Sequence, residues 1–285
     1  MIGIIGGTGL YQLEGLSNME SRKIKTPFGE PSAPVLVGKL STGDLSVNVA
    51  FLPRHGVHHE FLPSEINYRA NIWALKAIGV RQILSFSAVG SLTENIQPGE
   101  LAIPDQYFDF TKGRRVSSFF GDGLVAHIST AEPSCSLFSD HVAQKANEQG
   151  IPVHRKKTYA CVEGPRLGTR AESFFLQKAG CDLVGMTNIP EAFLAREAQL
   201  CYCTIAVVTD YDCWLDDPSQ HVSVDKVIDH YKANLNRVKK ILHSVLVSDL
   251  QDMVCACSHA LEGAIMTPED TLSPDKKRIL EFLMG

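Results

Sequence analysis

The stretch "CYCTIAVVTDYDCW", from Cys201 to Trp214, changes character at Thr209. Up to that residue it is uncharged and rich in β-branched side chains, which is typical of a strand buried on both faces. Two carboxylates, Asp210 and Asp212, follow at once with one residue between them. A buried strand that ends in two acids predicts a site, whether for a metal, a water molecule or part of a substrate.

Similar short apolar runs, most of them bounded by glycine, recur along the chain. They predict strands at residues 2–5, 33–40, 45–52, 80–90, 154–162, 181–186 and 201–209. Helical patterns at 64–78, 133–149, 169–179 and 190–199 alternate with them, and a long amphipathic helix at 224–250 precedes helical segments at 252–266 and 274–283. The alternation predicts an α/β fold with a mixed, largely parallel central β-sheet flanked by helices.

We expect a single domain over residues 1–285, in which about 250–285 form a C-terminal helical extension, and a long functional loop at 105–131. The net charge of -5 provides no basic surface for nucleic acid or an acidic membrane, so we expect neither as a partner. The chain shows no targeting or membrane-spanning stretch, and its eight cysteines are too sparse for a disulfide scaffold. A cytoplasmic location is therefore expected.

Two clusters of metal-binding residue types leave alternatives open. "CACSH", residues 255–259, is compatible with half of a metal site, with buried thiols or with a redox pair. "HGVHHE", residues 55–60, gathers three histidines and a glutamate but lacks the spacing of a zinc protease, so solvated loop residues are the alternative. Glu163 and Arg166 flank a Gly-Pro turn and either line a site or form a structural ion pair.

Several other predicted strands also end in groups that can bind an anion. The glycine-rich turn in "GIIGGTGL" (residues 3–10) offers backbone N–H groups and the hydroxyl of Thr8, and Arg54 with His55 follows another strand. Ser87, the N–H of Ala88, and Thr187 lie at further strand exits. Each turn taken alone also fits simple packing, but open α/β sheets bind ligands at the carboxyl ends of their strands.

The motifs "GIIGGTGL", "RHGVHH", "EGPRLGTRAESF", "GMTNIPEAFLAREA" and "TDYDCW" occur in this order. They resemble the trimeric purine nucleoside phosphorylase superfamily, and within it the 5'-methylthioadenosine phosphorylase family, from residue 2 to about 245. The resemblance implies a single-domain nucleoside phosphorylase fold and a homotrimer, with a hexamer built from two trimers as the further assembly. It also implies a reaction without metal or cofactor, in which the co-substrate inorganic phosphate displaces the base from C1' of the ribose.

The same resemblance assigns roles to residues at matching positions. Phosphate would be held by Thr8, Arg54, His55, Ser87, Ala88 and Thr187. Met186 would lie against the ribose, Leu167 and Gly168 against the base, and the 5' substituent would be surrounded by Val224, Val227, Ile228 and His127, the histidine coming from a neighbouring subunit. Asp210 and Asp212 would face the purine and, with His55, form the catalytic group.

The chemistry of the leaving base explains the two acids. Departure of a purine needs a proton at N7, and two carboxylates close together in a buried pocket cannot both ionise at low cost. One of them should therefore hold a proton near neutral pH and act as the general acid. His55 and Arg54 would both donate hydrogen bonds to the phosphate.

Base and sugar specificity follow from three positions. Relatives that bind 6-oxopurines carry Asn at the position of Asp210 and Glu at that of Gly168, and relatives that use 5'-hydroxyl nucleosides carry His at that of Val224. These differences favour phosphorolysis of 5'-methylthioadenosine to adenine and 5-methylthioribose 1-phosphate. Leu167 replaces a Phe of the adenine-specific members, so a methylthioinosine phosphorylase or a broader purine nucleoside phosphorylase is the alternative.

Two other functional classes are alternatives to a phosphorylase. A metal-dependent hydrolase would use His58, His59, Asp210 and Asp212. A purine-binding sensor would keep the fold without turnover, but the candidate catalytic residues are intact.

Overall fold

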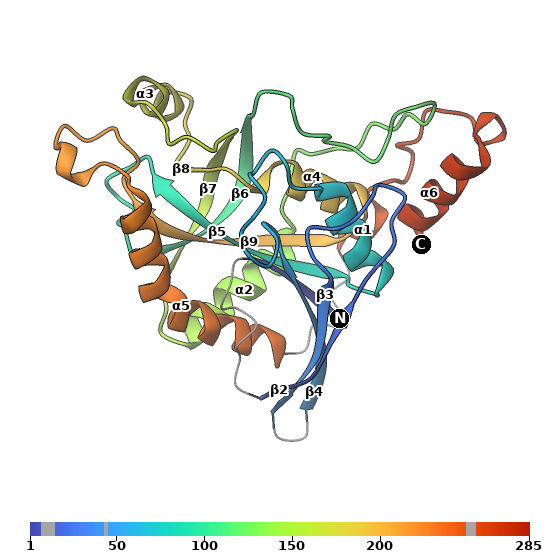
Figure 1. Ribbon diagram of the computed structural model, residues 1–285, viewed down its shortest axis with the longest axis horizontal. Helices are drawn as coiled ribbons and strands as arrows, with labels where there is room; N and C mark the ends of the chain where they lie inside the picture. The colour runs from blue at the N-terminus through green and yellow to red at the C-terminus, as the bar shows by residue number, and fades with distance from the viewer. Residues whose placement is uncertain (7–14, 43–44, 249–254) are drawn as a thin grey trace.

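The computed structural model of the chain describes residues 1–6, 15–42, 45–248 and 255–285, and one nine-stranded sheet runs through it (Figure 1). The strands are β1 (Ile2–Gly6), β2 (Leu16–Arg22), β3 (Val35–Thr42), β4 (Leu45–Pro53), β5 (Gln82–Ser91), β6 (Leu101–Phe110), β7 (Val153–Val162), β8 (Leu183–Gly185) and β9 (Cys201–Asp210). The helices are α1 (Tyr68–Ala77), α2 (Ser136–Glu148), α3 (Arg170–Lys178), α4 (Asn188–Glu197), α5 (Val224–Leu246) and α6 (Pro274–Met284).

The sheet is mixed, as the sequence predicts. Its strand order is β2-β3-β4-β1-β5-β8-β7-β6-β9, and β9 also pairs with β5, so the last five strands form a closed ring. Strands β4, β1, β5 and β9 are parallel to one another, whereas β3 is antiparallel to β4 and β8 is antiparallel to β5. The parallel strands bring their carboxyl ends to one edge of the sheet, where the candidate residues are expected.

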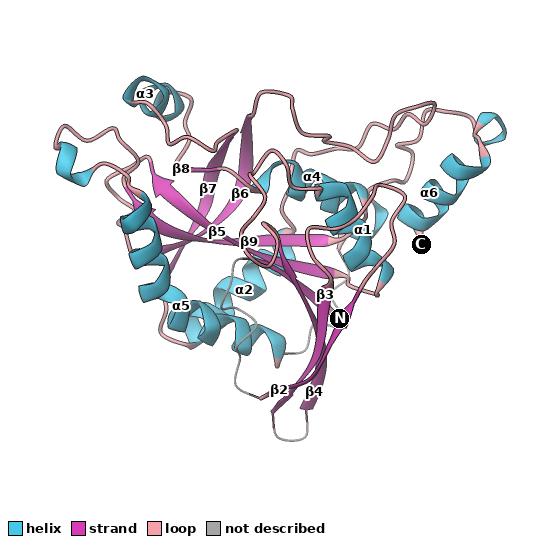
Figure 2. Cartoon of the chain, viewed as in Figure 1, coloured by secondary structure: helices cyan, strands magenta, loops and turns pink. Residues whose placement is uncertain are grey.

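Helices cover both faces of the sheet, which explains why β9 is apolar throughout (Figure 2). Ile205 and Val207 belong to a core shared with α2 and α5, whereas Ala206 and Val208 belong to a second core shared with α1 and α4. Successive strand residues point to opposite faces, so a strand between two helical layers has no polar face. No helix in the described parts of the chain is long and apolar enough to cross a membrane.

All seven predicted strands are present, but two observed strands were missed. Strand β2 has the sequence "LSNMESR" and is mostly exposed, so it carries no buried pattern. Strand β6 continues to Phe110 through polar residues, and the loop predicted at 105–131 therefore begins at residue 111. Exposed strand positions do not need the apolar residues on which the prediction depends.

The predicted helices are confirmed with changed ends, except the one predicted at 252–266. Helix α1 begins after Asn67, whose side chain accepts a hydrogen bond from the N–H of Ala70, rather than at Ser64. Helix α5 ends at Leu246, and in the described part of the predicted helix 252–266 only a short 3-10 turn, Ala256–His259, is helical. Helix α6 packs on α1, where the rings of Phe282 and Trp73 stack with centroids 3.7 Å apart.

Candidate active site

Arg54 follows β4 and is buried in a dense network of hydrogen bonds. Its Nε and Nη2 donate to the two carboxylate oxygens of Glu191 at 2.6 and 2.8 Å, and Nη2 also donates to Ser85 Oγ at 2.6 Å. Nη1 donates to the carbonyl oxygen of Phe86 at 3.1 Å. Four of the five guanidinium N–H groups therefore hold the side chain in place, and one on Nη1 is left by the described residues for a ligand.

The ion pair with Glu191 keeps Arg54 positively charged. The pKa of the guanidinium is raised by the carboxylate of Glu191 despite its burial, so the cation persists at any working pH. Its contacts with β5 and α4 hold the guanidinium in position before an anion binds. Such preorganisation is what electrostatic catalysis requires.

His55 lies beside Arg54 but does not present the donor that the sequence predicted. Its Nδ1 is 2.8 Å from the carbonyl oxygen of Phe61, so this nitrogen carries the proton and donates it. Burial lowers the pKa of His55 to about 4, which leaves the ring neutral. Nε2 then offers a lone pair, and it can accept a hydrogen bond from the P–O–H group of a monoprotonated phosphate rather than donate to it.

Tyr159 brings the next two phosphate candidates together. Its hydroxyl lies 3.2 Å from Ser87 Oγ, and it accepts a hydrogen bond from the N–H of Thr187 at 3.4 Å. Thr187 immediately precedes α4, whose first turn is interrupted by the non-helical backbone of Ile189. Ala88 follows on β5 and is partly exposed, while Thr8 lies outside the described residues.

The two acids lie at the carboxyl end of β9, and both are buried, with 5% of Asp210 and 6% of Asp212 exposed. Asp210 accepts hydrogen bonds from the hydroxyl of Thr209 at 2.7 Å and from the N–H of Asp212 at 2.8 Å. Asp212 accepts one from the hydroxyl of Ser173 at 2.5 Å. The backbone of Asp212 is left-handed, with a φ of 52°, and both acids lie beside Gly90 of β5.

Burial raises the pKa of both acids. The pKa of Asp210 rises to about 6, mainly through desolvation, with a contribution from the neighbouring Asp212. The pKa of Asp212 is also raised by desolvation, while the hydroxyl of Ser173 opposes the rise. Asp210 is therefore the member of the pair that can hold a proton close to neutral pH.

Two glycines make room for these acids. A Cβ atom on Gly90 would lie 2.8 Å from Oδ1 of Asp210 and 3.3 Å from Cβ of Asp212. A Cβ atom on Gly168 would lie 3.4 Å from Oδ2 of Asp212. The predicted base-binding position Gly168 thus borders the acids directly, and a larger side chain there would enter the pocket.

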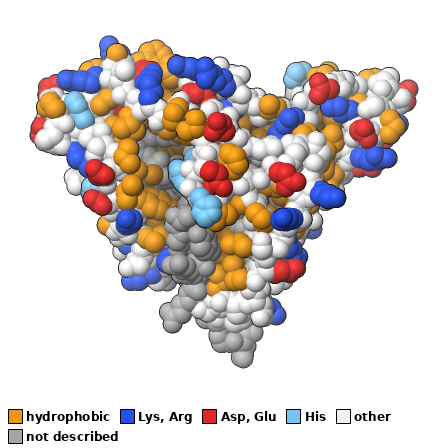
Figure 3. Space-filling model, viewed as in Figure 1, with side chains coloured by type: hydrophobic (Ala, Val, Ile, Leu, Met, Phe, Trp, Pro, Cys, Tyr) orange, Lys and Arg blue, Asp and Glu red, His pale blue; other side chains and the backbone are white. Residues whose placement is uncertain are grey.

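The residues expected around the sugar are divided between two regions. Met186 precedes Thr187, and its carbonyl oxygen accepts a hydrogen bond from Arg115 at 2.7 Å. Leu167 and the α5 residues Val224 and Ile228 are exposed apolar side chains, with Val224 65% exposed, and Val227 is partly buried. Figure 3 shows the face of the molecule hollowed beside apolar side chains on its left, the side on which Figure 1 places α5.

Within one chain, His127 does not lie with the other residues that are expected around the 5' substituent. Its N–H donates to the carbonyl oxygen of Ala264, and Ala126 forms a β-bridge with Ile265. This ribbon leads to α6, which lies on the opposite side of the molecule from α5 (Figure 1). The described residues of one chain therefore do not bring His127 to the apolar side chains of α5.

Four residues that hold the site were not identified as functional from the sequence. Glu191 orients Arg54, Ser173 orients Asp212, Tyr159 joins Ser87 to Thr187, and Arg115 holds the backbone of Met186. Glu191 is completely buried, and its only signal in the sequence is an acid within an otherwise apolar helix start. Glu163 and Arg166 do not pair with each other, because Glu163 binds Arg115 and Arg166 binds Glu172.

The histidine-rich segment does not form a metal site with the acids. Within the described parts of the chain, the group of ligand-type side chains close enough to share an ion is a set of four cysteines elsewhere. His59 stacks on His55, and Glu60 accepts a hydrogen bond from the N–H of His58. Neither histidine is brought to Asp210 or Asp212 as a ligand set, so the hydrolase alternative has no support in the described residues.

Known proteins with similar sequences and structures were compared with the chain. The family model described as the phosphorylase superfamily matches residues 1–247. The S-methyl-5'-thioadenosine phosphorylase of Geobacter sulfurreducens is 46% identical over 285 residues, which cover 100% of this chain and 98% of that protein. The enzyme of the same name from Hyperthermus butylicus is 47% identical over 269 residues, covering 93% of this chain and 95% of that protein.

Solved structures agree with the sequence relatives. A methylthioadenosine phosphorylase from an antarctic soil metagenomic library superposes with a TM-score of 0.91 at 45% identity, covering 100% of this chain and 98% of that one. The methylthioadenosine phosphorylase of Schistosoma mansoni in complex with adenine gives a TM-score of 0.84 at 35% identity, covering 95% of this chain and 99% of that one. Both similarities extend through the sheet that carries Arg54 and the two acids.

Proposed function

Because the chain belongs to the phosphorylase superfamily and to its S-methyl-5'-thioadenosine phosphorylases, we propose that it cleaves 5'-methylthioadenosine with inorganic phosphate. The products are adenine and 5-methylthioribose 1-phosphate. The observation that carries this proposal is the buried Asp210, whose pKa is raised to about 6, at the end of β9, which pairs with the strand β5 that holds the buried cation Arg54 through Ser85 and Phe86.

Asp210 is suited to read adenine and to protonate it. Each of its carboxyl oxygens accepts one internal hydrogen bond, which leaves each with a further lone pair or proton toward the pocket. A protonated carboxyl can donate to N7 while its other oxygen accepts from the 6-amino group. The same carboxyl would place an acceptor against the oxygen of a 6-oxopurine, and an unpaired buried acceptor costs about 1–3 kcal/mol.

On β5, the proposed phosphate-binding residues are separated from Asp210 by about the length of a nucleoside. Ser87 and Gly90 are three residues apart on this strand, roughly 10 Å, and Gly90 contacts Asp210. A ribose fits between a phosphate at Ser87 and a base at Asp210. Arg54 stabilises the charge on the phosphate, and neutral His55 accepts a hydrogen bond from the P–O–H group of the monoprotonated dianion, which faces the developing positive charge at C1'.

We further propose a homotrimer, in which the 5' pocket is completed by a neighbouring copy. The exposed apolar side chains of the described residues include a pair at Val224 and Ile228 and another pair at Val125 and Met266. Val125 and Met266 belong to the ribbon that presents His127. Two different patches on one chain suit a head-to-tail ring, and His127 would then reach the methylthio pocket of the next subunit. Two such rings could stack as a hexamer.

The remaining features of the proposed function follow from the same site. Catalysis uses Asp210, Asp212 and His55 and needs no metal or cofactor beyond phosphate. The single sheet supports one catalytic domain over residues 1–285 with the part beyond about 250 as its extension. The free thiols of all eight cysteines suit the reducing cytoplasm, where the two products would enter purine and methionine salvage without a nucleic-acid or membrane partner.

A substrate comparison tests the proposed specificity. Purified protein is assayed at saturating phosphate with methylthioadenosine, methylthioinosine, adenosine and inosine, and kcat/KM is measured for each. We expect methylthioadenosine to be used best and both 6-oxopurine nucleosides to be at least about 100-fold poorer, because the acid pair rejects O6. Preference for methylthioinosine over methylthioadenosine would contradict the reading of Asp210.

A further inference from the structure

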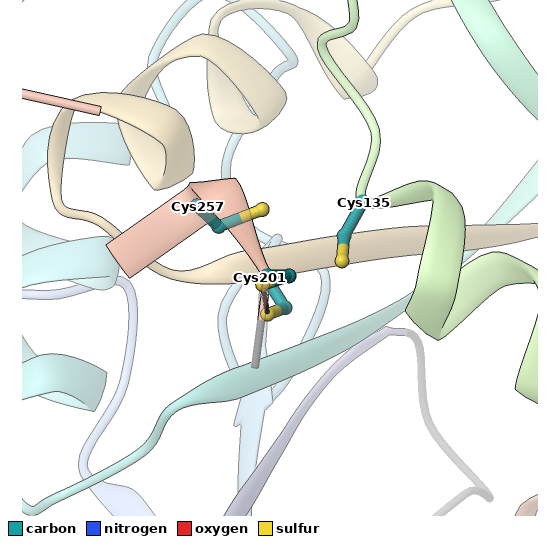
Figure 4. Close-up of side chains that lie close together, drawn as sticks. Cys135, Cys201 and Cys257 are labelled. Atoms are coloured by element: carbon teal, nitrogen blue, oxygen red, sulfur yellow. Dashed lines mark hydrogen bonds between the residues drawn. The ribbon is translucent and has the colours of Figure 1, made fainter. Parts of the chain in front are cut away.

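A second group of reactive side chains lies far from the proposed active site. We call it the thiol cluster, and its members are Cys135, Cys201, Cys255 and Cys257. They come from the start of α2, the start of β9 and the turn that opens the C-terminal segment. Figure 4 shows the side chains of Cys135, Cys201 and Cys257 converging from these three elements.

The spacing of the sulfur atoms matches a closed metal site. All four Sγ atoms lie within 4.8 Å of one another, and those of Cys201 and Cys255 are 3.2 Å apart. Four thiolates bound tetrahedrally at about 2.3 Å from a zinc ion would have their sulfur atoms roughly 3.8 Å apart. Changes of about 1 Å or less in the distances between sulfur atoms therefore bring the cluster to that geometry.

A partly buried cation beside the cluster supports a negatively charged site. Arg196 on α4 donates from Nη1 to Sγ of Cys257 at 3.2 Å. Its Nε is buried and has no hydrogen-bond partner among the described residues. Four neutral thiols attract a guanidinium only weakly, whereas a tetrathiolate with a divalent ion carries two negative charges and accepts N–H donors at sulfur.

The sequence motif that first suggested a metal is only half of this arrangement. Of "CACSH", His259 points away, because its Nδ1 binds Glu262 Oε1 at 2.5 Å on the exposed surface. Cys135 and Cys201 supply the missing ligands instead. An all-sulfur set excludes the hard cations and favours zinc among the common divalent ions.

We propose that the thiol cluster binds one zinc ion as a closed, structural tetrathiolate site. Binding breaks four S–H bonds, releases four protons to solvent and forms four Zn–S bonds, so no oxidant or reductant is needed. The sequence leaves a metal site open for residues 255–259, and the family resemblance implies only that the reaction itself needs no metal. It is independent of the proposed catalytic function.

The position of the cluster defines what the ion does. Cys201 begins β9 and Asp210 ends it, and the ten residues of this strand separate the two by roughly 30 Å. Zinc there cannot take part in nucleoside chemistry. It joins the segment beginning at Cys255 to β9 and α2, and thereby fastens the part of the chain that carries α6 to the core.

The first experiment measures metal content on the full chain. Protein is expressed with zinc in the medium, purified in a phosphine reductant, dialysed against metal-free buffer and analysed for zinc, copper and iron by mass spectrometry. We expect one zinc per chain in the unaltered protein and loss of zinc in Cys135→Ser and Cys257→Ser. Cys181→Ser is the matched control, because Cys181 is also a buried free thiol but lies outside the cluster, and it should retain one zinc.

A second measurement does not depend on whether the variants fold. Zinc is removed from the unaltered protein with a chelator and cobalt(II) is added, and a tetrathiolate gives intense visible d–d bands and sulfur-to-metal charge transfer. Zinc added back should abolish these bands and raise the melting temperature, with four protons released per ion bound. Absence of zinc with no cobalt spectrum, iron with acid-labile sulfide, or a Cys201–Cys255 disulfide found by peptide mapping would each overturn the proposal.

Discussion

Replacing Asp210 by Asn separates the acid role of this residue from its place in the fold. The amide oxygen of Asn can still accept the N–H of residue 212, which lies 2.8 Å from Oδ1 in the present structure. The amide nitrogen then faces Thr209, whose hydroxyl can turn its proton to the carbonyl oxygen of Val89, 3.2 Å away, and accept from the amide. The substitution therefore keeps both contacts, and the protein should fold.

The expected loss comes from proton transfer alone. An Asn amide can donate a hydrogen bond to N7 of adenine and accept one from the 6-amino group, but it cannot deliver a proton to the leaving base. General acid catalysis contributes about 10²–10⁴-fold, or roughly 3–5 kcal/mol of transition-state stabilisation. We expect kcat for methylthioadenosine to fall by that factor with little change in KM.

The same change should improve the relative use of 6-oxopurines. The amide N–H can donate to O6 while the amide oxygen accepts from a protonated N7, which is the complementary pattern for hypoxanthine. The assay measures kcat/KM for methylthioadenosine and methylthioinosine in both proteins, with Asp275→Asn on α6 as a distant control of the same chemistry. If the ratio of the two values were unchanged, or if the melting temperature of Asp210→Asn fell sharply, the assigned role would be wrong.

Three further predictions concern the same pocket. Gly90→Ala should lower kcat/KM by at least about tenfold, because its Cβ would lie 2.8 Å from Asp210 Oδ1, and an enzyme with normal nucleoside kinetics would contradict this geometry. Glu191→Gln leaves Arg54 buried with a neutral partner, so the free energy of unfolding measured with urea should fall by about 3–5 kcal/mol, and KM for phosphate should rise. An unchanged free energy of unfolding would argue against the ion pair. The active form of Asp210 is protonated and its pKa is about 6, so kcat/KM of the free enzyme, measured at constant phosphate dianion, should fall as pH rises above that value. A rate that increases steadily from about pH 6 to 9 would exclude Asp210 as the acid. His55 is neutral above pH 4 and should not contribute to this decrease.

The sequence predicts the parts of the fold that are buried, and fails where burial is absent. Strand β9 is apolar on both faces because helices cover both, so its pattern has a single interpretation. Strand β2 and the second half of β6 are exposed and polar, and their strand form depends on pairing with β3 and β7 rather than on their own residues. The residues of such a strand do not by themselves show that it pairs with another strand.

The candidate site shows the same division between local and long-range information. Strand patterns and family motifs make Arg54, Ser87 and Asp210 candidates, because these residues lie in or next to recognisable strands. Their partners come from distant segments: Glu191 is 137 residues from Arg54. Local spacing gives no sign of such contacts.

Hydrogen-bond direction is also beyond the sequence. The sequence predicts His55 as a phosphate donor, yet the carbonyl oxygen of Phe61 occupies its Nδ1 and turns the remaining nitrogen into an acceptor. The thiol cluster is a similar case. Its ligands come from three segments of the chain. The sequence motif 255–259 supplies only two of these ligands.

The most direct test of the proposed reaction is phosphate dependence with identification of the sugar product. The protein is incubated with methylthioadenosine, with and without inorganic phosphate, while adenine is quantified by chromatography and phosphorus is followed by ³¹P NMR. We expect adenine to form only when phosphate is present, with one equivalent of a new sugar 1-phosphate resonance for each adenine. Release of adenine at the same rate without phosphate, and without a phosphate ester, would show hydrolysis instead and contradict the phosphorylase mechanism.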